Sequence, residues 1–152
     1  MNNKSVKDNM NIFRAFSEGM YNDNLEGLME YIDENVEWVI MATGETFRGI
    51  DEFRQLALRS MDARKHTKET HAEFTNVFNS EDQSQMCIEY IHGAIATEKW
   101  TGSSDIRPAA GARRQVKICL VCHVKNGKWD KVHEYFDLKS VTEGPSEFRL
   151  YP

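Results

Sequence analysis

Residues 124–141, VKNGKWDKVHEYFDLKSV, contain the turn that decides the fold. Asn126-Gly127 is typical of a two-residue hairpin turn, because both positions must tolerate a positive φ. The turn predicts antiparallel strands over residues 115–125 and 128–138. A regular ladder counted back from it pairs Lys125 with Lys128 and, on one strand face, Val121 with Val132, Cys119 with Glu134 and Lys117 with Phe136. A carboxylate therefore interrupts an otherwise mainly apolar strand face.

Glu134 has two interpretations. On an exposed sheet face it is a solvated glutamate, the usual place for this residue type. In a cavity lined by apolar neighbours it is desolvated, and its pKa rises towards the range useful for proton transfer. Tyr90 and His92 alternate on one face of the preceding predicted strand, from which they can hydrogen-bond such a carboxyl group. Each also fits a simpler role, as a core tyrosine and a hydrogen-bonded buried histidine.

The segment KICLVCHV, residues 117–124, contains C-x-x-C-H, a pattern found in haem attachment, zinc and redox sites. Its apolar residues alternate with period two, which indicates a strand. Cys119 and Cys122 then point to opposite faces, so they cannot share a metal ion or form a disulfide. The histidines His66, His71 and His123 show no metal-ligand spacing either. We therefore predict ordinary cysteines and no metal or organic cofactor.

Composition limits the classes of partner. The chain has 152 residues, 40% of them hydrophobic, and a formal net charge of −5, which predicts one domain without a nucleic-acid surface. The N-terminal residues lack the apolar run of a signal peptide, and no segment has the length and apolarity of a membrane span. We expect a cytoplasmic protein with reduced cysteines, and a core over about residues 6–141 followed by a tail over 139–152.

The apolar pattern predicts an α+β fold. Helices are expected over residues 5–21, 25–32 and from Asp51 to about Met61, the second capped by Asp23 or Asn24. The expected strands are 36–41, a short segment at 46–48, 71–78, 84–97, 115–125 and 128–138, with a long loop over 98–114. Helices segregated from a run of antiparallel strands pack on one face of a curved sheet, and a cavity between the layers is where a ligand is expected.

Three segments carry a resemblance to a known family: NDNLEGLMEYIDENVEW (22–38), GETFRGIDEFRQLA (44–57) and the hairpin quoted above. Together with the opening helix they resemble the nuclear transport factor 2-like superfamily, and within it the SnoaL-like polyketide cyclase group. The resemblance implies a cone-shaped, strongly curved antiparallel sheet wrapped around three helices, with a hydrophobic pocket at the open end. It also implies a homodimer that uses the outer sheet face.

Catalytic motifs of this superfamily match only in part. The three acid and tyrosine positions of ketosteroid isomerases correspond to Phe16, Cys119 and Trp38 or Ile40, so that chemistry is not expected. Tyr90 and His92 stand at the Arg-x-Asp pair of limonene-epoxide hydrolases. Glu134 stands at the acidic position of the final strand, and it is the best counterpart of the general acid/base of polyketide cyclases.

Two functions remain open. In the first, the chain is an acid/base enzyme for a small hydrophobic molecule, with Glu134 moving the proton and His92 and Tyr90 orienting the substrate. The cavity would then be shaped by Phe16, Trp38, Met41, Cys119, Val121, Val132 and Phe136. In the second, the chain is a non-catalytic dimeric ligand-binding or interaction module of the same fold.

Overall fold

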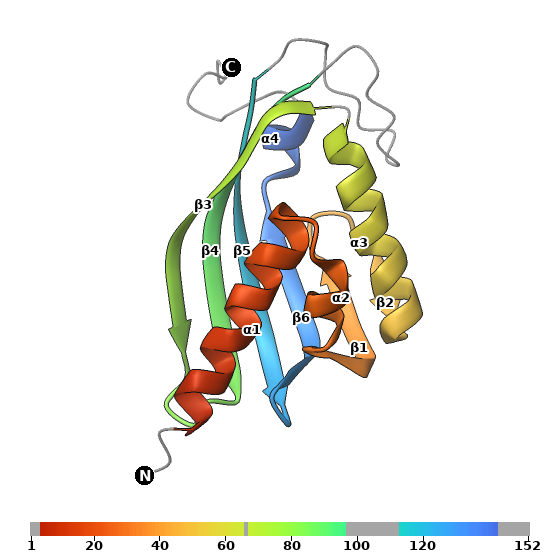
Figure 1. The fold of residues 1–152 in the computed structure, drawn as a ribbon. Helices are drawn as coiled ribbons and strands as arrows, with labels where there is room; N and C mark the ends of the chain where they lie inside the picture. The colour runs from red at the N-terminus through yellow and green to blue at the C-terminus, as the bar shows by residue number, and fades with distance from the viewer. Residues whose placement is uncertain (1–3, 66, 97–112, 143–152) are drawn as a thin grey trace.

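The structure is a computed structural model that describes residues 4–65, 67–96 and 113–142 (Figure 1). Its helices are α1 (Lys4–Tyr21), α2 (Leu25–Met29), α3 (Gly49–Lys65) and α4 (Leu138–Thr142). Its strands are β1 (Ile32–Ile40), β2 (Thr46–Arg48), β3 (Thr67–Asn79), β4 (Gln85–Ala96), β5 (Arg113–Lys125) and β6 (Lys128–Phe136). Nearly all of the loop predicted over 98–114, and most of the tail predicted over 139–152, lie outside the described residues.

The helices follow the predicted apolar stripes. Ile12 and Phe16, one turn apart on α1, are buried, and so are Phe53 and Leu56 on α3. Asn24 caps α2, because its side-chain oxygen accepts a hydrogen bond from the Gly27 amide at 3.2 Å. α2 is shorter than predicted, and β1 begins earlier, at Ile32.

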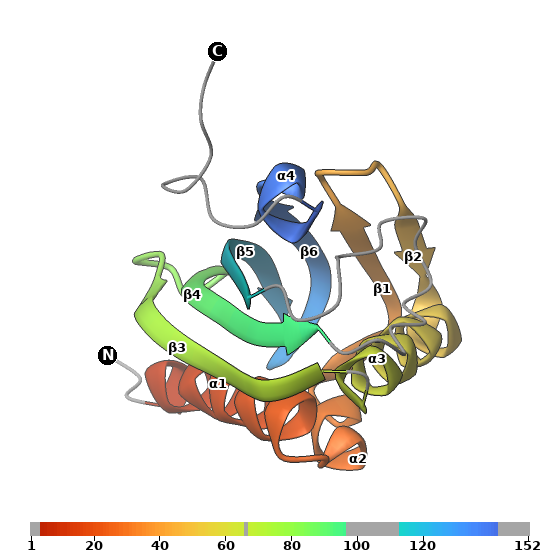
Figure 2. The same cartoon turned by 90° about the horizontal axis from the view of Figure 1, so that it is seen from above.

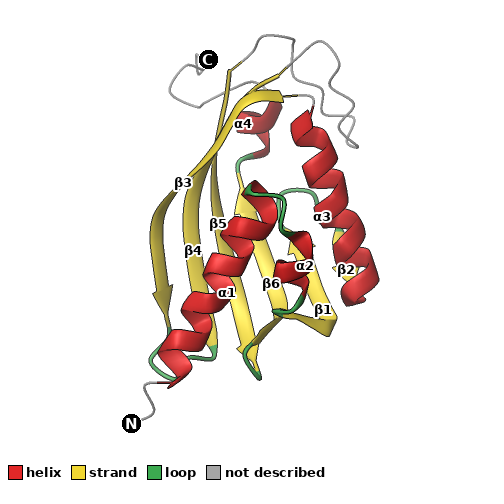
Figure 3. Cartoon of the chain, in the orientation of Figure 1, coloured by secondary structure: helices red, strands yellow, loops and turns green. Residues whose placement is uncertain are grey.

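The strands form one six-stranded sheet in the order β2-β1-β6-β5-β4-β3. Seen from above, the sheet bends into an arc, and α1 and α3 close the side opposite β5 and β6 (Figure 2). Figure 3 shows the same division between a helical layer and a strand layer. The α+β prediction is confirmed. One pair departs from the predicted antiparallel sheet, since β1 and β6 run parallel. The long connection between them, through α3 and four strands, permits this.

The predicted hairpin is present, but its register changes after the first two pairs. Asn126 and Gly127 have φ values of 53° and 73°, as a two-residue hairpin turn requires. Lys125 pairs with Lys128, and Val124 with Trp129, as predicted. A register shift then places His123 opposite Lys131 instead of Asp130. The structure therefore has a β-bulge at Asp130, where one extra residue enters β6.

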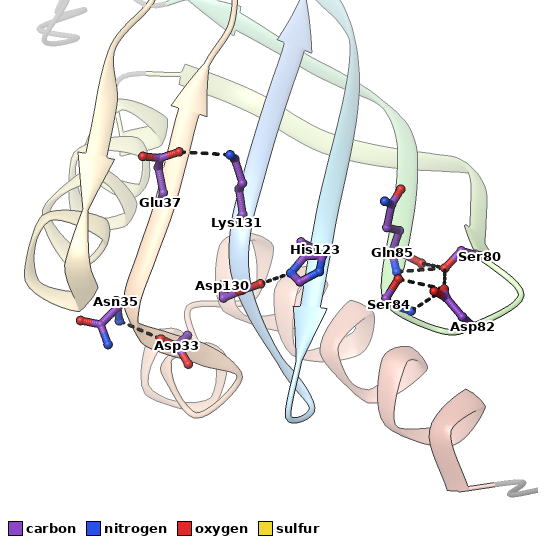
Figure 4. A network of polar contacts seen from close by, with 10 residues as sticks. All are labelled: Asp33, Asn35, Glu37, Ser80, Asp82, Ser84, Gln85, His123, Asp130 and Lys131. Carbon is purple, nitrogen blue, oxygen red and sulfur yellow. Dashed lines mark hydrogen bonds and ion pairs between the residues drawn. The ribbon is translucent and has the colours of Figure 1, made fainter.

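This bulge corrects the predicted strand faces. Beyond it, Glu134 pairs with Leu120, and Cys119 pairs with Tyr135. The prediction that Glu134 shares a face with Cys119 and Val121 is wrong, because one inserted residue exchanges the two faces of a strand. At the bulge, the Asp130 carboxylate lies 2.6 Å from Nδ1 of His123 on the outer side of the sheet (Figure 4).

The bulge also completes the core. Trp129 and Val132 are both fully buried although they are three residues apart, a spacing that a regular strand cannot place on one face. On the inner side they meet residues of α1 and β1: the rings of Phe16 and Trp129 lie 5.5 Å apart, and those of Trp38 and Trp129 lie 6.2 Å apart. Figure 4 shows the neighbouring outward contact, an ion pair of 3.5 Å between Lys131 and Glu37.

Candidate functional site

A cavity of about 250 Å³ lies between the helices and the inner face of the sheet. The end of α1, the last two turns of α3 and strands β4, β5 and β6 all contribute side chains to it. The lining is formed by Met20, Tyr21, Ser60, Ala63, Arg64, Thr67, Tyr90, His92, Ala94, Val116, Ile118, Glu134 and Phe136. Glu134, Tyr90 and His92, which the sequence singled out, thus line one cavity.

Glu134 brings a carboxyl group into this cavity from the centre of β6. Its Oε2 accepts a hydrogen bond from the indole Nε1–H of Trp38 on β1, at 2.8 Å. Burial raises the pKa of the Glu134 carboxyl above its ordinary value, and the Trp38 hydrogen bond opposes that rise. Among the described residues, no hydrogen bond reaches the second carboxyl oxygen. The indole therefore fixes the carboxyl group while one oxygen stays available.

Tyr90, Tyr21 and His92 form a chain of hydrogen bonds beside Glu134. The Tyr21 hydroxyl lies 3.0 Å from Nδ1 of His92. A side-chain hydrogen bond also joins Tyr21 and Tyr90, and it lowers the pKa of Tyr21 while it raises that of Tyr90. Which of the Tyr21 hydroxyl and the His92 ring donates depends on the tautomer of His92.

All three members of this chain are uncharged at neutral pH. Burial, with smaller contributions from Arg64 and His71, lowers the pKa of His92 to about 4. Burial raises the pKa of Tyr21 to about 12 and that of Tyr90 well above its ordinary value. The chain consequently offers neutral hydrogen-bonding groups, of the kind that hold a carbonyl or enol oxygen.

Sequence reasoning missed four polar residues of the lining, Tyr21, Ser60, Arg64 and Thr67. Tyr21 and Arg64 are the two that bear on the chemistry. Tyr21 is the last residue of α1, five residues beyond the Phe16 position that was compared with the isomerase tyrosine. Arg64 lies in a polar stretch of the sequence, ARKHTKE (63–69), which carries no recognisable motif. The only feature that could have pointed to Tyr21 and Arg64 is their position, since both lie in the last turns of their helices, at the same end of the sheet.

The predicted apolar pocket residues divide into three groups. Phe136 lines the cavity. Trp38 is not part of the lining, but its indole donates a hydrogen bond to Glu134. Phe16 and Val132 belong to the buried core and are absent from the lining. The prediction that the remaining three residues line the cavity is wrong. With the bulge, Cys119 and Val121 lie on the outer face of the sheet, opposite to Glu134. Met41 follows the end of β1 and lines a hollow on the outer sheet face with Cys119.

The cysteines are free thiols, and the prediction that Cys119 and Cys122 face opposite sides is confirmed. Cys122 is buried in the core, whereas Cys119 lies on the outer face, where its Sγ is 3.5 Å from that of Cys87. Burial raises the pKa of Cys87 to about 12, so its thiol stays protonated. The C-x-x-C pattern thus follows from strand alternation.

Across residues 4–65, 67–96 and 113–142, no group of three or more His, Cys, Asp and Glu side chains is arranged to hold a metal ion. Within the same ranges, no helix combines the length and apolarity that crossing a membrane requires.

Solved structures share this fold at low sequence identity. A putative polyketide cyclase from Xanthomonas campestris pv. campestris has a TM-score of 0.72 and 14% identity, over 93% of this chain and 98% of that one. A putative SnoaL-like polyketide cyclase from Jannaschia sp. CCS1 has a TM-score of 0.70 and 11% identity, over 95% and 98%. An LEH-like epoxide hydrolase from M. tuberculosis has a TM-score of 0.63 and 14% identity, over 91% and 89%.

These likenesses show the fold alone. A comparison with curated proteins found no match. The model of the SnoaL-like domain family matches residues 13–132, which is most of the chain and includes Trp38, Tyr90 and His92. Glu134 lies just beyond the matched range. The resemblance noted in the sequence is confirmed, and this chain belongs to the SnoaL-like domain family.

Proposed function

We propose that this protein is a small acid/base enzyme that moves a proton on an apolar cyclic or carbonyl-containing substrate, with Glu134 as the proton-transfer group. The observation that carries the proposal is the half-buried Glu134 carboxyl group, which lines a cavity and is fixed on one oxygen by Trp38. A carboxyl with a raised pKa can hold its proton closer to neutral pH, as general acid/base catalysis at that pH requires.

The surroundings of Glu134 supply the other parts that such a reaction needs. The Tyr90–Tyr21–His92 chain offers uncharged hydrogen-bonding groups for a carbonyl or enol oxygen. The apolar part of the lining, including Ile118 and Phe136, excludes water and favours a hydrophobic substrate. Isomerisation, aldol-type cyclisation, dehydration and hydration all fit one positioned acid/base group. Similar structures bear names from the same range, namely polyketide cyclases and an epoxide hydrolase.

Proton transfer can be tested before the natural substrate is known. Small cyclic ketones are incubated with the protein in heavy water, and mass spectrometry measures deuterium incorporation next to the carbonyl. We expect Glu134→Gln to lower the exchange rate by about a hundredfold or more, because the amide cannot take up the proton. Glu73→Gln is the matched control, since Glu73 is exposed on β3.

Two results would contradict the proposal. Equal exchange by the wild type and Glu134→Gln would show that another group moves the proton. Ketone binding without any exchange, detected as a rise in the thermal midpoint, would select the non-catalytic ligand-binding module instead.

The outer face of the sheet supports a homodimer. Val121 and Tyr135 lie on this face of β5 and β6 and are 40% and 43% exposed. Exposed apolar side chains grouped on one face favour contact with another protein surface, and a two-fold dimer brings the same face of both copies together. We therefore include self-association through this face in the proposal.

A further inference from the structure

Arg64 is a cationic residue of the cavity lining that has no carboxylate partner. It lies in the last turn of α3 and shares the cavity with Glu134 and His92. Its guanidinium carbon lies 5.2 Å from the centre of the Tyr21 ring, a cation–π contact. None of the ion pairs among the described residues includes Arg64. Asp23 raises its pKa through charge alone, without an ion pair.

A basic residue in the last turn of a helix often serves the helix dipole, and Lys65 illustrates that role. Lys65 is exposed and pairs with Asp62 at 3.4 Å. Arg64 differs from its neighbour, because burial lowers the pKa of its guanidinium. Placing a permanent charge where it loses water is unfavourable unless a partner of opposite charge compensates. An interaction with the helix dipole accounts for the position of Lys65, but it does not account for the partial burial of Arg64.

No other lining residue neutralises Arg64. Tyr21, Tyr90 and His92 are uncharged at neutral pH. The Glu134 carboxyl group is held by the Trp38 indole, and among the described residues no ion pair joins it to Arg64. Among the described lining residues, Arg64 is then the only permanently charged group. The cavity is therefore complementary to a ligand with one negative charge.

The position of Arg64 also suits the capture of a ligand. Arg64 and Tyr21 line both the inner cavity and a larger hollow of about 680 Å³ formed by the end of α1, α3 and β3. Both residues are therefore shared by the two spaces. The inner volume of about 250 Å³ lies below the range of about 300–1,000 Å³ that is typical of drug-sized ligands, so a molecule with one or two rings fits best.

We propose that Arg64 is a substrate-binding residue, and that the substrate is a small cyclic molecule with one carboxylate, held by the Arg64 guanidinium while its reacting atom lies at Glu134. A guanidinium matches a carboxylate because two parallel N–H groups can donate to its two oxygens. The assignment of the reacting atom rests on the proposed function above, whereas the carboxylate site stands on Arg64 alone.

The test compares probes that differ only in charge. Benzoate, cyclohexanecarboxylate and 2-naphthoate are titrated against the protein by calorimetry, each beside its neutral carboxamide. We expect the wild type to prefer each carboxylate, and Arg64→Gln to weaken carboxylate binding about tenfold or more while carboxamide binding stays unchanged. Arg64→Lys should keep part of the preference, because it retains the charge without the two-pronged geometry. Lys65→Gln is the matched control and should bind like the wild type.

Three results would overturn the inference: equal binding of carboxylate and carboxamide by the wild type, no binding of either, or an equal loss of both in Arg64→Gln. The last result would indicate a structural role. Should Arg64→Gln fail to fold, Arg64→Lys provides the test. If Arg64→Lys binds each carboxylate as tightly as the wild type does, with the same preference over the carboxamide, the bidentate contact of the guanidinium is ruled out. If the wild type prefers carboxylates but does not catalyse ketone exchange, the carboxylate site at Arg64 is supported and the acid/base proposal fails. If it catalyses ketone exchange but shows no carboxylate preference, only the Arg64 inference fails.

Discussion

At the level of single residues, the Glu134 carboxyl group is subject to two opposing influences. Burial favours its neutral form, and the Trp38 indole stabilises its charged form by donating a hydrogen bond at 2.8 Å. Burial dominates, so the pKa is raised. The same indole leaves one carboxyl oxygen facing the cavity. A single neighbour thus both orients the acid and limits the rise of its pKa.

This pKa shift predicts how stability depends on pH. In the unfolded chain Glu134 loses its proton at an ordinary glutamate pKa, and in the folded protein at a higher one. The contribution of Glu134 to stability is therefore complete below the ordinary pKa and is lost as pH rises through the raised pKa. The loss amounts to about 1.4 kcal/mol for each unit by which burial raises the pKa.

We expect Glu134→Gln to remove this dependence. Urea unfolding across the pH range should show the variant gaining stability relative to the wild type as pH rises, and Glu73→Gln should follow the wild type. A wild type that gains stability relative to Glu134→Gln over that range would mean that the folded protein lowers the pKa of Glu134.

Strand alternation alone predicts that Tyr90 and His92 share one face of their strand, whereas the face of Glu134 follows only when the bulge at Asp130 is counted. Tyr21 and Arg64 could not be found in the same way. Each ends a helix, and which way a helix end points depends on how the helix packs on the sheet, which no local pattern encodes. Charged residues near helix ends are also common for dipole reasons, so Arg64 gave no distinctive signal.

At the level of elements, the bulge at Asp130 decides which side chains of β6 face the cavity. The Asn126-Gly127 turn fixes only the pairs next to it, and regular counting fails where one residue is inserted. One feature of the sequence is consistent with the bulge: Trp129 and Val132 are large apolar residues three positions apart. The structure buries both fully. A regular strand would have sent one of these two large apolar side chains into water.

Removing the bulge should therefore be more harmful than removing its side chain. Deletion of Asp130 would make β6 regular and turn Val132, Glu134 and Phe136 outward, so we expect a loss of about 3 kcal/mol or more, or no folding. Asp130→Ala removes only a contact with the exposed His123 and should cost less than about 1 kcal/mol. Urea unfolding measures both. A deletion as mild as the alanine substitution would show that the strand does not need the extra residue.

At the level of the whole molecule, the fold brings together groups that are distant in the chain. Tyr21 on α1, Arg64 on α3, Tyr90 on β4 and Glu134 on β6 meet at one cavity because the sheet bends around the helices (Figure 2). The sequence predicted the layers and nearly all of the elements. The parallel contact between β1 and β6 was missed, because pairing between strands that are distant in sequence depends on the assembled sheet.

The outer face of this sheet predicts the oligomeric state. We expect the wild type to be a dimer by size-exclusion chromatography with light scattering, and Val121→Lys to shift it towards a monomer with the fold intact. A charge on a buried apolar contact is strongly unfavourable, which is the reason for the shift. Leu58→Lys, at a comparably exposed apolar position on α3, should remain dimeric. A wild type that is monomeric at all concentrations would contradict this expectation.

The most direct test is an NMR titration of the glutamate side-chain carboxyl carbons, with the Glu134 signal assigned by its loss in Glu134→Gln. We predict that Glu134 titrates at a clearly higher pH than the exposed glutamates, and that Trp38→Phe raises its pKa further by removing the indole donor. A Glu134 signal that titrates together with those of the exposed glutamates would contradict the account, because a solvated carboxyl group has no special capacity to move a proton.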